Sequence, residues 1–233
     1  MTTYRETRRR GDFLPQPLAV SPLAVEGAIG GVPVRVFTPP NVRLTYLHLH
    51  GGGFVYGGAR LQDARLEALA LACDARVVSV EYRLAPEQPY PAAPDDCEAV
   101  AAVLAGESGP IAIGGESAGA NLAVVTLARL RDRGVTSFRA AVLIAGFYDL
   151  HGTTDPELVA LVEQYAPSGD DALQLDLRDL PEALFVVGSN DPLLEDTLRM
   201  AARWPDAHLV VREDEGHDLD ASGEVTDFLQ RLL

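Results

Sequence analysis

Ile111-Ala112-Ile113-Gly114-Gly115-Glu116-Ser117-Ala118-Gly119 is the stretch around which the rest of this sequence is organised. An apolar, strand-like run over residues 110–113 leads into it, and a helical pattern follows over residues 120–131. A strand, Gly-x-Ser-x-Gly and a helix in this order are typical of a nucleophile elbow, a sharp turn that presents a serine hydroxyl to a cleft. The flanking glycines lack the Cβ atoms that would clash in such a turn. The alternative, a plain turn that happens to contain Ser117, stays open in a chain with 21 glycines.

A serine hydroxyl is a poor nucleophile unless a general base takes its proton, and a third group must hold that base in the right tautomer. On a parallel α/β sheet the chain order of these groups is serine, acid, histidine. His217 is the histidine in a loop after the last predicted strand, residues 209–211. We therefore predict that His217 is the base, the alternative being a solvated loop residue.

The predicted acid is Asp191, which comes soonest after the apolar strand at residues 184–187. Its alternative role is a capping or Asx-turn residue before Pro192. Glu195 and Asp196, further along the chain, are the reserve candidates.

Three consecutive glycines follow another predicted strand, residues 44–50, in His50-Gly51-Gly52-Gly53-Phe54. Their unhindered backbone N–H groups are suited to stabilise an oxyanion. A phosphate-binding loop is the alternative, but this run lacks the Lys-Ser/Thr of a P-loop and does not open a helix.

Composition excludes several classes of partner. The chain has 233 residues, 47% of them apolar, and a net charge of −15. The length suits a single domain over residues 1–233, and so acidic a chain is repelled by nucleic acid and by anionic membrane surfaces. All basic residues are arginine, which excludes a lysine Schiff base. No metal-ligand spacing occurs, so we expect no metal and no cofactor.

Other features bear on location and assembly. Cys73 and Cys97 lie in apolar helical stretches and are predicted to be buried free thiols. Residues 1–22 begin polar, with Arg8-Arg9-Arg10, and are then broken by prolines, so we expect a surface segment and no export signal. No run reaches the ~18–20 apolar residues of a membrane span. We expect a cytoplasmic protein, and both monomer and homodimer stay open.

The remaining pattern alternates short apolar strands with helices. This predicts an α/β fold with a mostly parallel central sheet that helices cover on both faces. The expected strands are a hairpin at 25–28 and 32–37, then 44–50, 77–80, 110–113, 140–145, 184–187 and 209–211. The expected helices are 61–73, one from Asp95 or Asp96 to Leu104, 120–131, 156–165 within an acidic insertion at 147–180, 194–204 and 225–232.

Taken together, these motifs resemble the hormone-sensitive-lipase-like esterases of the α/β-hydrolase superfamily. The matching motifs, in order, are His50-Gly51-Gly52-Gly53-Phe54, Glu81-Tyr82-Arg83-Leu84-Ala85-Pro86-Glu87, Gly115-Glu116-Ser117-Ala118-Gly119, Asp191-Pro192-Leu193 and Gly216-His217. The resemblance covers residues 44–233. Because independent motifs agree in order, it is specific.

The resemblance implies an α/β-hydrolase fold and a serine carboxylic-ester hydrolase acting on small-molecule esters. It implies that Ser117 is the nucleophile and that Asp191 and His217 are its partners. The backbone N–H groups of Gly52, Gly53 and Ala118 would form the oxyanion hole. Arg83 would pair with Asp95 or Asp96. We expect the substrate pocket to be lined by Phe54, Glu116, Tyr148, Leu193 and Leu219.

The sequence also departs from the family pattern. Residues 1–22 are too short and proline-rich for the family's N-terminal cap helices, and the insertion at 147–180 is small. Asp218-Leu219 replaces Gly-Phe after the histidine, and residues 143–146 lack a Ser-Pro. A reduced cap predicts an open pocket that accepts short acyl groups.

Two other functions stay open at this point. An amidase such as an arylformamidase could use the same fold and triad. A non-catalytic receptor for a small ligand is the alternative from another class, although receptors of this kind have lost the histidine. Carboxylates around His217, from Glu213 to Asp220, predict a pKa above the ordinary ~6.5 for the imidazole.

Overall fold

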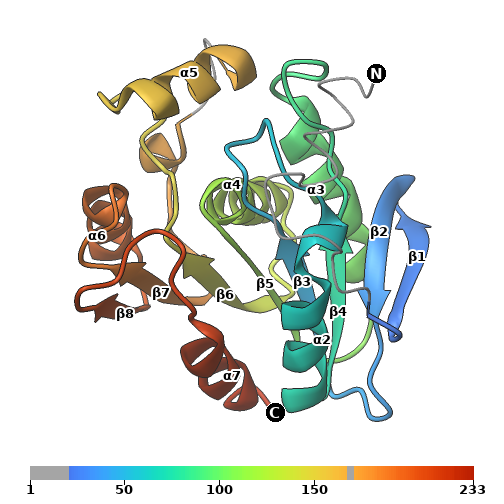
Figure 1. Ribbon diagram of the computed structural model, residues 1–233. Coiled ribbons are helices and arrows are strands. Elements are labelled where there is room, and N and C mark those ends of the chain that lie inside the picture. The colour runs from blue at the N-terminus through green and yellow to red at the C-terminus, as the bar shows by residue number, and fades with distance from the viewer. Residues whose placement is uncertain (1–20, 167–170) are drawn as a thin grey trace.

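The computed structural model describes residues 21–166 and 171–233. Its centre is an eight-stranded sheet with the order β1-β2-β4-β3-β5-β6-β7-β8 (Figure 1). The pairs β1–β2 and β2–β4 are antiparallel, and all the other pairs are parallel. The strands are β1 Ala24–Ile29, β2 Val32–Phe37, β3 Leu44–Leu49, β4 Ala75–Val80, β5 Ile111–Glu116, β6 Phe138–Ile144, β7 Glu182–Gly188 and β8 Ala207–Arg212.

The predicted hairpin is confirmed. β1 and β2 pair from Ala24↔Phe37 to Ile29↔Val32, which leaves Gly30 and Gly31 as the turn. Their φ angles of 60° and 82° lie in the left-handed region, which glycine enters without strain.

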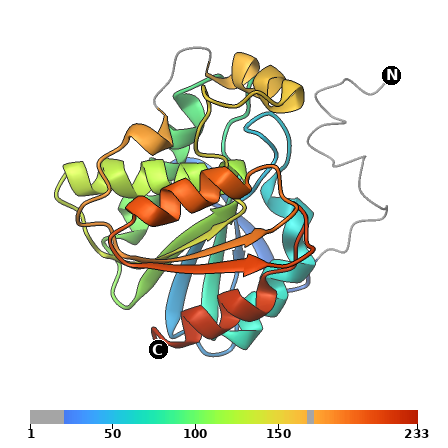
Figure 2. The same cartoon turned by 90° about the vertical axis from the view of Figure 1, so that its left-hand side faces the viewer.

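Helices cover both faces of the sheet (Figure 2). Side chains of α3, α4 and α6 pack into the larger core cluster on one face, and those of α2 and α7 pack into a second cluster on the other. Residues alternate between the two clusters along the strands: Phe185 belongs to the first, whereas Leu184 and Val186 belong to the second. The helices are α2 Asp63–Ala72, α3 Ala92–Leu104, α4 Ala118–Asp132, α5 Pro156–Tyr165, α6 Leu194–Arg203 and α7 Ser222–Gln230, with short 3-10 turns η1 Ala59–Gln62 and η2 Ala172–Gln174.

Three predicted boundaries are wrong by three residues or more. The strand expected to end at residue 113 continues to Glu116, and the helix expected to start at residue 225 starts at Ser222. The helix expected to start at Asp95 or Asp96 starts at Ala92, with Pro91 as its N-cap residue. Asp96 lies inside this helix because its carboxylate is used elsewhere: it accepts hydrogen bonds from the Arg83 backbone N–H at 2.9 Å and from the Arg83 side chain at 2.8–3.1 Å. The pairing of Arg83 with Asp96 is thus confirmed, while Asp95 pairs with Arg129.

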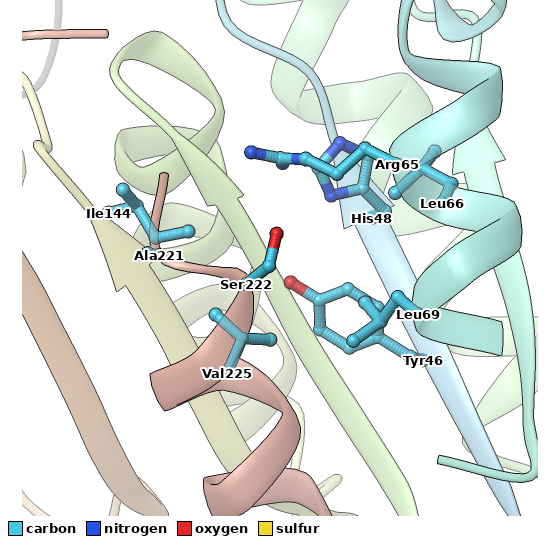
Figure 3. Close-up of a pocket in the computed structure, with 9 residues that line it drawn as sticks. All are labelled: Tyr46, His48, Arg65, Leu66, Leu69, Ile144, Ala221, Ser222 and Val225. Carbon is cyan, nitrogen blue, oxygen red and sulfur yellow. The ribbon is translucent and has the colours of Figure 1, made fainter. Parts of the chain in front are cut away.

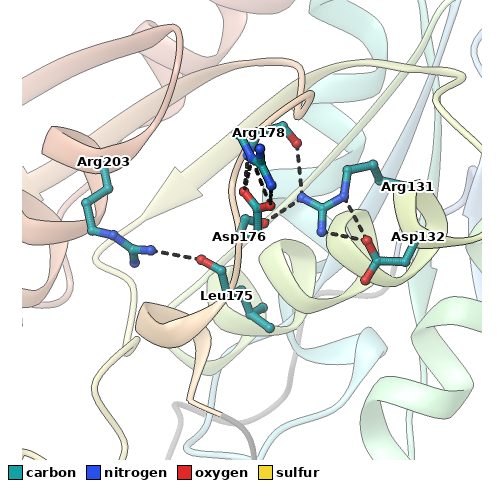
Figure 4. A network of polar contacts seen from close by, with 6 residues as sticks. All are labelled: Arg131, Asp132, Leu175, Asp176, Arg178 and Arg203. Atoms are coloured by element: carbon teal, nitrogen blue, oxygen red, sulfur yellow. Dashed lines mark hydrogen bonds and ion pairs between the residues drawn. The ribbon is translucent and has the colours of Figure 1, made fainter.

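The insertion at 147–180 contributes α5 and η2. Asp155 caps α5 by accepting hydrogen bonds from the N–H groups of Glu157 and Leu158. Two arginines of the neighbouring helices bind the part of the insertion that precedes β7 (Figure 4). Arg131 of α4 donates to the carbonyls of Asp176 and Arg178. Arg203 of α6 donates to the carbonyls of Leu173 and Leu175. The prediction for residues 1–22 falls almost wholly outside the described residues.

Candidate active site

Ser117 stands at the turn between β5 and α4. Its backbone has φ 54° and ψ −118°, a strained conformation for a residue with a Cβ atom. The surroundings hold it there: the Ser117 N–H donates to the Ile144 carbonyl at 2.9 Å, and its own carbonyl accepts from the Phe147 N–H at 3.2 Å. Strain of this kind is typical of functional turns, and the observed strand–turn–helix order is the one that the sequence predicts.

The flanking glycines of this turn are required by close backbone contacts. A Cβ atom on Gly115 or on Gly119 would collide with the carbonyl oxygen of Leu49, at the end of β3. The turn therefore packs directly against the start of the glycine run at residues 51–53.

His217 and Asp191 are brought together from loops after two neighbouring strands. The imidazole Nδ1 lies 3.1 Å from Oδ1 and 3.0 Å from Oδ2 of Asp191. A carboxylate can only accept, so Nδ1 carries the hydrogen and Nε2 is left as the proton acceptor. The Asp191 side chain is fully buried and also accepts from the Leu193 N–H at 2.8 Å, whereas the His217 side chain is 38% exposed.

The loop that carries His217 is fixed to the end of β7. The Asn190 N–H donates to the Glu215 carbonyl at 2.8 Å, and the Asp214 N–H donates to the Ser189 hydroxyl at 2.9 Å. Arg212 pairs with Glu215 at 2.8 Å and with the carboxylate of Glu224, in α7, at 2.5 Å. These contacts limit where the imidazole can lie.

The pKa of His217 is raised above its ordinary value, as predicted. The main cause is the hydrogen bond to Asp191; burial opposes it, and the charges of Asp191, Asp218 and Glu116 add to the rise. Of the acidic cluster that prompted the prediction, Asp218 is the member that contributes. The hydrogen bond to Asp191, not the charge run as a whole, is the largest cause of the raised pKa.

The glycine loop after β3 faces Ser117. Gly52 and Gly53 have φ angles of 117° and 58°, a conformation that favours glycine at both positions. The loop is held from below by Tyr82, whose hydroxyl donates to the His50 carbonyl at 2.6 Å and whose ring stacks on His50 at 4.1 Å. It is closed by the Tyr56 N–H, which donates to the Gly52 carbonyl at 2.8 Å.

A cavity of about 590 Å³ opens over these groups. Ser117, His217 and the glycine loop all contribute to its wall, as do the predicted Glu116 and Leu219. The volume is in the range of small-molecule sites. Its further lining includes the apolar side chains of Ile144, Phe147, Leu158 and Leu161 and the polar side chains of Gln62, Arg65 and Asp218.

Three residues predicted to line the pocket do not line this cavity. Phe54 and Tyr148 are fully buried and Leu193 is 3% exposed. Phe54 stacks on Tyr165 of α5, with ring centroids 3.9 Å apart, inside the core. All three belong to the larger core cluster and support the site from behind.

Sequence reasoning missed the wall formed by Leu158 and Leu161 of α5 and by Gln62 and Arg65 of η1 and α2. Leu161 packs over the glycine loop so closely that a Cβ atom on Gly53 would strike it. The helical spacing of Leu158 and Leu161, beside the buried Val162 and Tyr165, could have indicated a second apolar face.

A second, water-sized cavity of about 20 Å³ adjoins the first, since Arg65 and Ile144 line both. In Figure 3 the hydroxyls of Tyr46 and Ser222 point into the same space, below the Arg65 guanidinium and the His48 ring. Burial lowers the pKa of His48 to about 4, so its imidazole is neutral near pH 7.

The described residues contain neither a metal-binding group nor a membrane-spanning helix. In residues 21–166 and 171–233, no three His, Cys, Asp or Glu side chains gather as a metal-binding group. Over the same ranges no helix is long and apolar enough to cross a membrane. Both cysteines are free and buried, as predicted.

Comparison with known proteins agrees with this geometry. A family model described as the alpha/beta hydrolase fold matches residues 46–219. Esterase LipI of Mycobacterium tuberculosis is 31% identical over 228 residues, covering 78% of this chain and 68% of LipI. Versiconal hemiacetal acetate esterase of Aspergillus parasiticus is 36% identical over 149 residues, covering 62% of this chain and 47% of that protein, about half its length.

A solved structure extends the likeness to the whole chain. An esterase from the bacterial hormone-sensitive lipase family superposes with a TM-score of 0.89 at 27% identity, covering 100% of this chain and 92% of the other. The fold, the order of the motifs and these relatives agree. The chain therefore belongs to the hormone-sensitive-lipase-like esterases of the α/β-hydrolase superfamily.

Proposed function

We propose that this protein hydrolyses small carboxylic esters through an acyl-enzyme formed on Ser117. One observation carries the proposal. His217 and Ser117 line the same cavity, and the imidazole of His217 is fixed through Nδ1 to the buried carboxylate of Asp191. The relatives named as esterases favour this activity over an amidase or a receptor.

The proposed reaction uses these groups in turn. Nε2 of His217 takes the proton of the Ser117 hydroxyl while the serine oxygen attacks the ester carbonyl. Asp191 holds the imidazole in the required tautomer and stabilises the imidazolium that forms. When the tetrahedral intermediate collapses, His217 returns the proton to the leaving alcohol. Water then attacks the acyl-enzyme by the same steps and releases the acid.

The tetrahedral intermediate carries a negative oxygen, for which the proposed donors are the N–H groups of Gly52, Gly53 and Ala118. Ala118 is the first residue of α4, where backbone N–H groups lack partners within the helix and the helix dipole favours a negative charge. Each such donor is worth about 3–4 kcal/mol in the transition state.

Two leucines of α5 and Phe147 form an apolar wall near the glycine loop, which supports an acyl subsite of limited length. The acetate ester named for the Aspergillus relative points the same way. We therefore propose short acyl groups as the preferred substrates.

The free thiols of Cys73 and Cys97 support a cytoplasmic location, which recovery of the enzyme in a secreted or membrane fraction would contradict.

The test is a substrate panel of p-nitrophenyl acetate, butyrate and decanoate together with an aryl formamide. We expect turnover of the two short esters at the highest kcat/KM and loss of turnover to the uncatalysed background in Ser117→Ala. A clear preference for decanoate would overturn the short-acyl assignment. Faster turnover of the formamide than of every ester would instead favour an amidase.

A further inference from the structure

Glu116, the residue directly before Ser117, accepts hydrogen bonds from three donors, which lie in the glycine loop, in η1 and in α2. Its Oε1 accepts the Gly51 backbone N–H at 2.9 Å and also the side-chain amide of Gln62. Its Oε2 accepts from Arg65 Nη2 at 2.8 Å and lies 3.6 Å from Nε2 of His48. A single carboxylate thus ties the glycine loop to η1 and α2.

The contact with Gly51 matters because the next two residues of the chain, Gly52 and Gly53, are the proposed oxyanion donors. As glycines, they have no side chain to hold their peptide planes. The loop is fixed on its other side by the hydroxyl of Tyr82 at the His50 carbonyl, 2.6 Å away. The Glu116 carboxylate fixes the N–H group of Gly51, and this limits the orientation of the peptide groups of Gly52 and Gly53 that follow it.

The charge of Glu116 is secured by its surroundings. Burial alone would raise the pKa of this carboxyl. Arg65, the Gly51 N–H, Gln62 and His48, which is itself protonated below its own pKa of about 4, outweigh burial and lower the pKa to about 2. Gln62 is itself oriented, because His48 Nε2–H donates to Gln62 Oε1 at 2.7 Å and so turns the Gln62 amide group toward Glu116. Hydrogen bonds to a carboxylate are about twice as strong as neutral ones.

We propose that Glu116 is a positioning residue for the oxyanion hole, held in place by His48, Gln62 and Arg65. This inference rests on the proposed ester hydrolysis. Its carboxylate acts through the Gly51 amide and touches no reacting atom. Because the oxyanion exists only in the transition state, losing this anchor lowers kcat and leaves KM nearly unchanged.

The test compares Glu116→Ala, Glu116→Gln and the wild type with p-nitrophenyl acetate. We expect Glu116→Ala to lower kcat by about 10²–10³-fold, the loss seen when one oxyanion donor is removed, with KM changed less than about threefold. Glu116→Gln can still accept from Gly51, so it retains part of the rate. The affinity for a trifluoromethyl ketone, which forms an oxyanion on the serine, falls in parallel with kcat.

A matched control separates positioning from general stability. Glu98 is a buried glutamate of α3 that pairs with Arg129 and Arg133, away from the glycine loop. Glu98→Ala is expected to lower the melting temperature without changing kcat. If Glu116→Ala does not fold, the kcat and ketone affinity of Glu116→Gln decide the question.

Three outcomes overturn the inference. In the first, kcat is unchanged and KM rises, which makes Glu116 a wall of the pocket only. In the second, kcat falls but the ketone binds as tightly as to the wild type. In the third, Glu98→Ala loses as much kcat as Glu116→Ala. Failure of the proposed function looks different, because the wild type itself would then turn over no ester.

Discussion

His217 Nδ1 lies 3.0 Å from Oδ2 of Asp191, a residue 26 positions earlier in the chain. The two residues follow β7 and β8, which are parallel neighbours in register from Ala183↔Ala207 to Gly188↔Arg212. Strand order therefore brings Asp191 and His217 to the same edge of the sheet. The buried carboxylate of Asp191 fixes the tautomer of the His217 imidazole and raises its pKa.

Asp191→Asn should lower kcat by about 10³–10⁴-fold and change KM little, because an amide can donate to Nδ1 and so stabilise the wrong tautomer. The measurement is the steady-state rate with p-nitrophenyl acetate. The matched control is Asp196→Asn, which alters an acid that binds the backbone N–H groups of Tyr148 and Asp149 and not His217. An Asp191→Asn enzyme with more than about a tenth of the wild-type kcat would contradict the assignment.

The acidic limb of the pH profile should have its midpoint above the ordinary histidine value of about 6.5. Only neutral His217 can accept a proton, and its raised pKa keeps it protonated to a higher pH. The midpoint is read from kcat/KM against pH. Asp218→Asn removes one of the charges that raise this pKa and should move the midpoint downward. A wild-type midpoint at or below that value would show that the carboxylates are screened by solvent.

Leu161→Ala should extend the range of acyl chains. The Leu161 side chain packs against Gly53 in the cavity wall, so its removal leaves room for additional methylene groups. A methylene in an apolar pocket is worth roughly 10-fold or more in specificity, and we expect kcat/KM for a hexanoyl ester relative to an acetyl ester to rise by about that factor. Leu71→Ala, at an exposed position on α2, is the control. An unchanged ratio in Leu161→Ala would place the acyl group elsewhere.

Asp63→Ala should destabilise the fold by about 3–5 kcal/mol, because it removes the buried counter-charge of the Arg35 guanidinium and leaves only the exposed Glu26 beside it. Arg35 Nη2 lies 2.5 Å from Asp63 Oδ2, with side-chain exposures of 7% and 0%. Chemical denaturation gives the free energy of unfolding. Asp176→Ala breaks the exposed pair with Arg178 (Figure 4) and should have a much smaller effect. Equal losses in the two variants would contradict this reasoning.

Much of the fold was predictable because its signals are local. The apolar runs mark β4 to β8, and Gly30-Gly31 marks the hairpin between β1 and β2. The elbow could be placed for the same reason, since its strand, its Gly-x-Ser-x-Gly turn and its helix follow one another in the chain. The contacts of Gly115 and Gly119 with Leu49, which is distant in sequence, became visible only in the structure. The start of α3 could not be predicted. Aspartate is a common N-cap residue, but the carboxylate of Asp96 binds Arg83 instead of capping the helix.

The pocket wall was less predictable because it depends on how segments distant in sequence pack. Phe54 follows the glycine loop directly, yet its ring stacks on Tyr165 of α5. Leu161, and not Phe54, lines the cavity. Tyr148 and Leu193 are likewise adjacent to site loops and point into the core. Adjacency in sequence does not determine side-chain direction, and no local pattern links Gln62 or Arg65 to Glu116.

The most direct test of the account is covalent labelling with a fluorophosphonate, followed by peptide mass spectrometry of the wild type, Ser117→Ala and His217→Ala. The account predicts one label per chain on the peptide that contains Ser117, no label in Ser117→Ala, and labelling of His217→Ala at least about 10³-fold slower. A label on another residue, or equally fast labelling without His217, would contradict it.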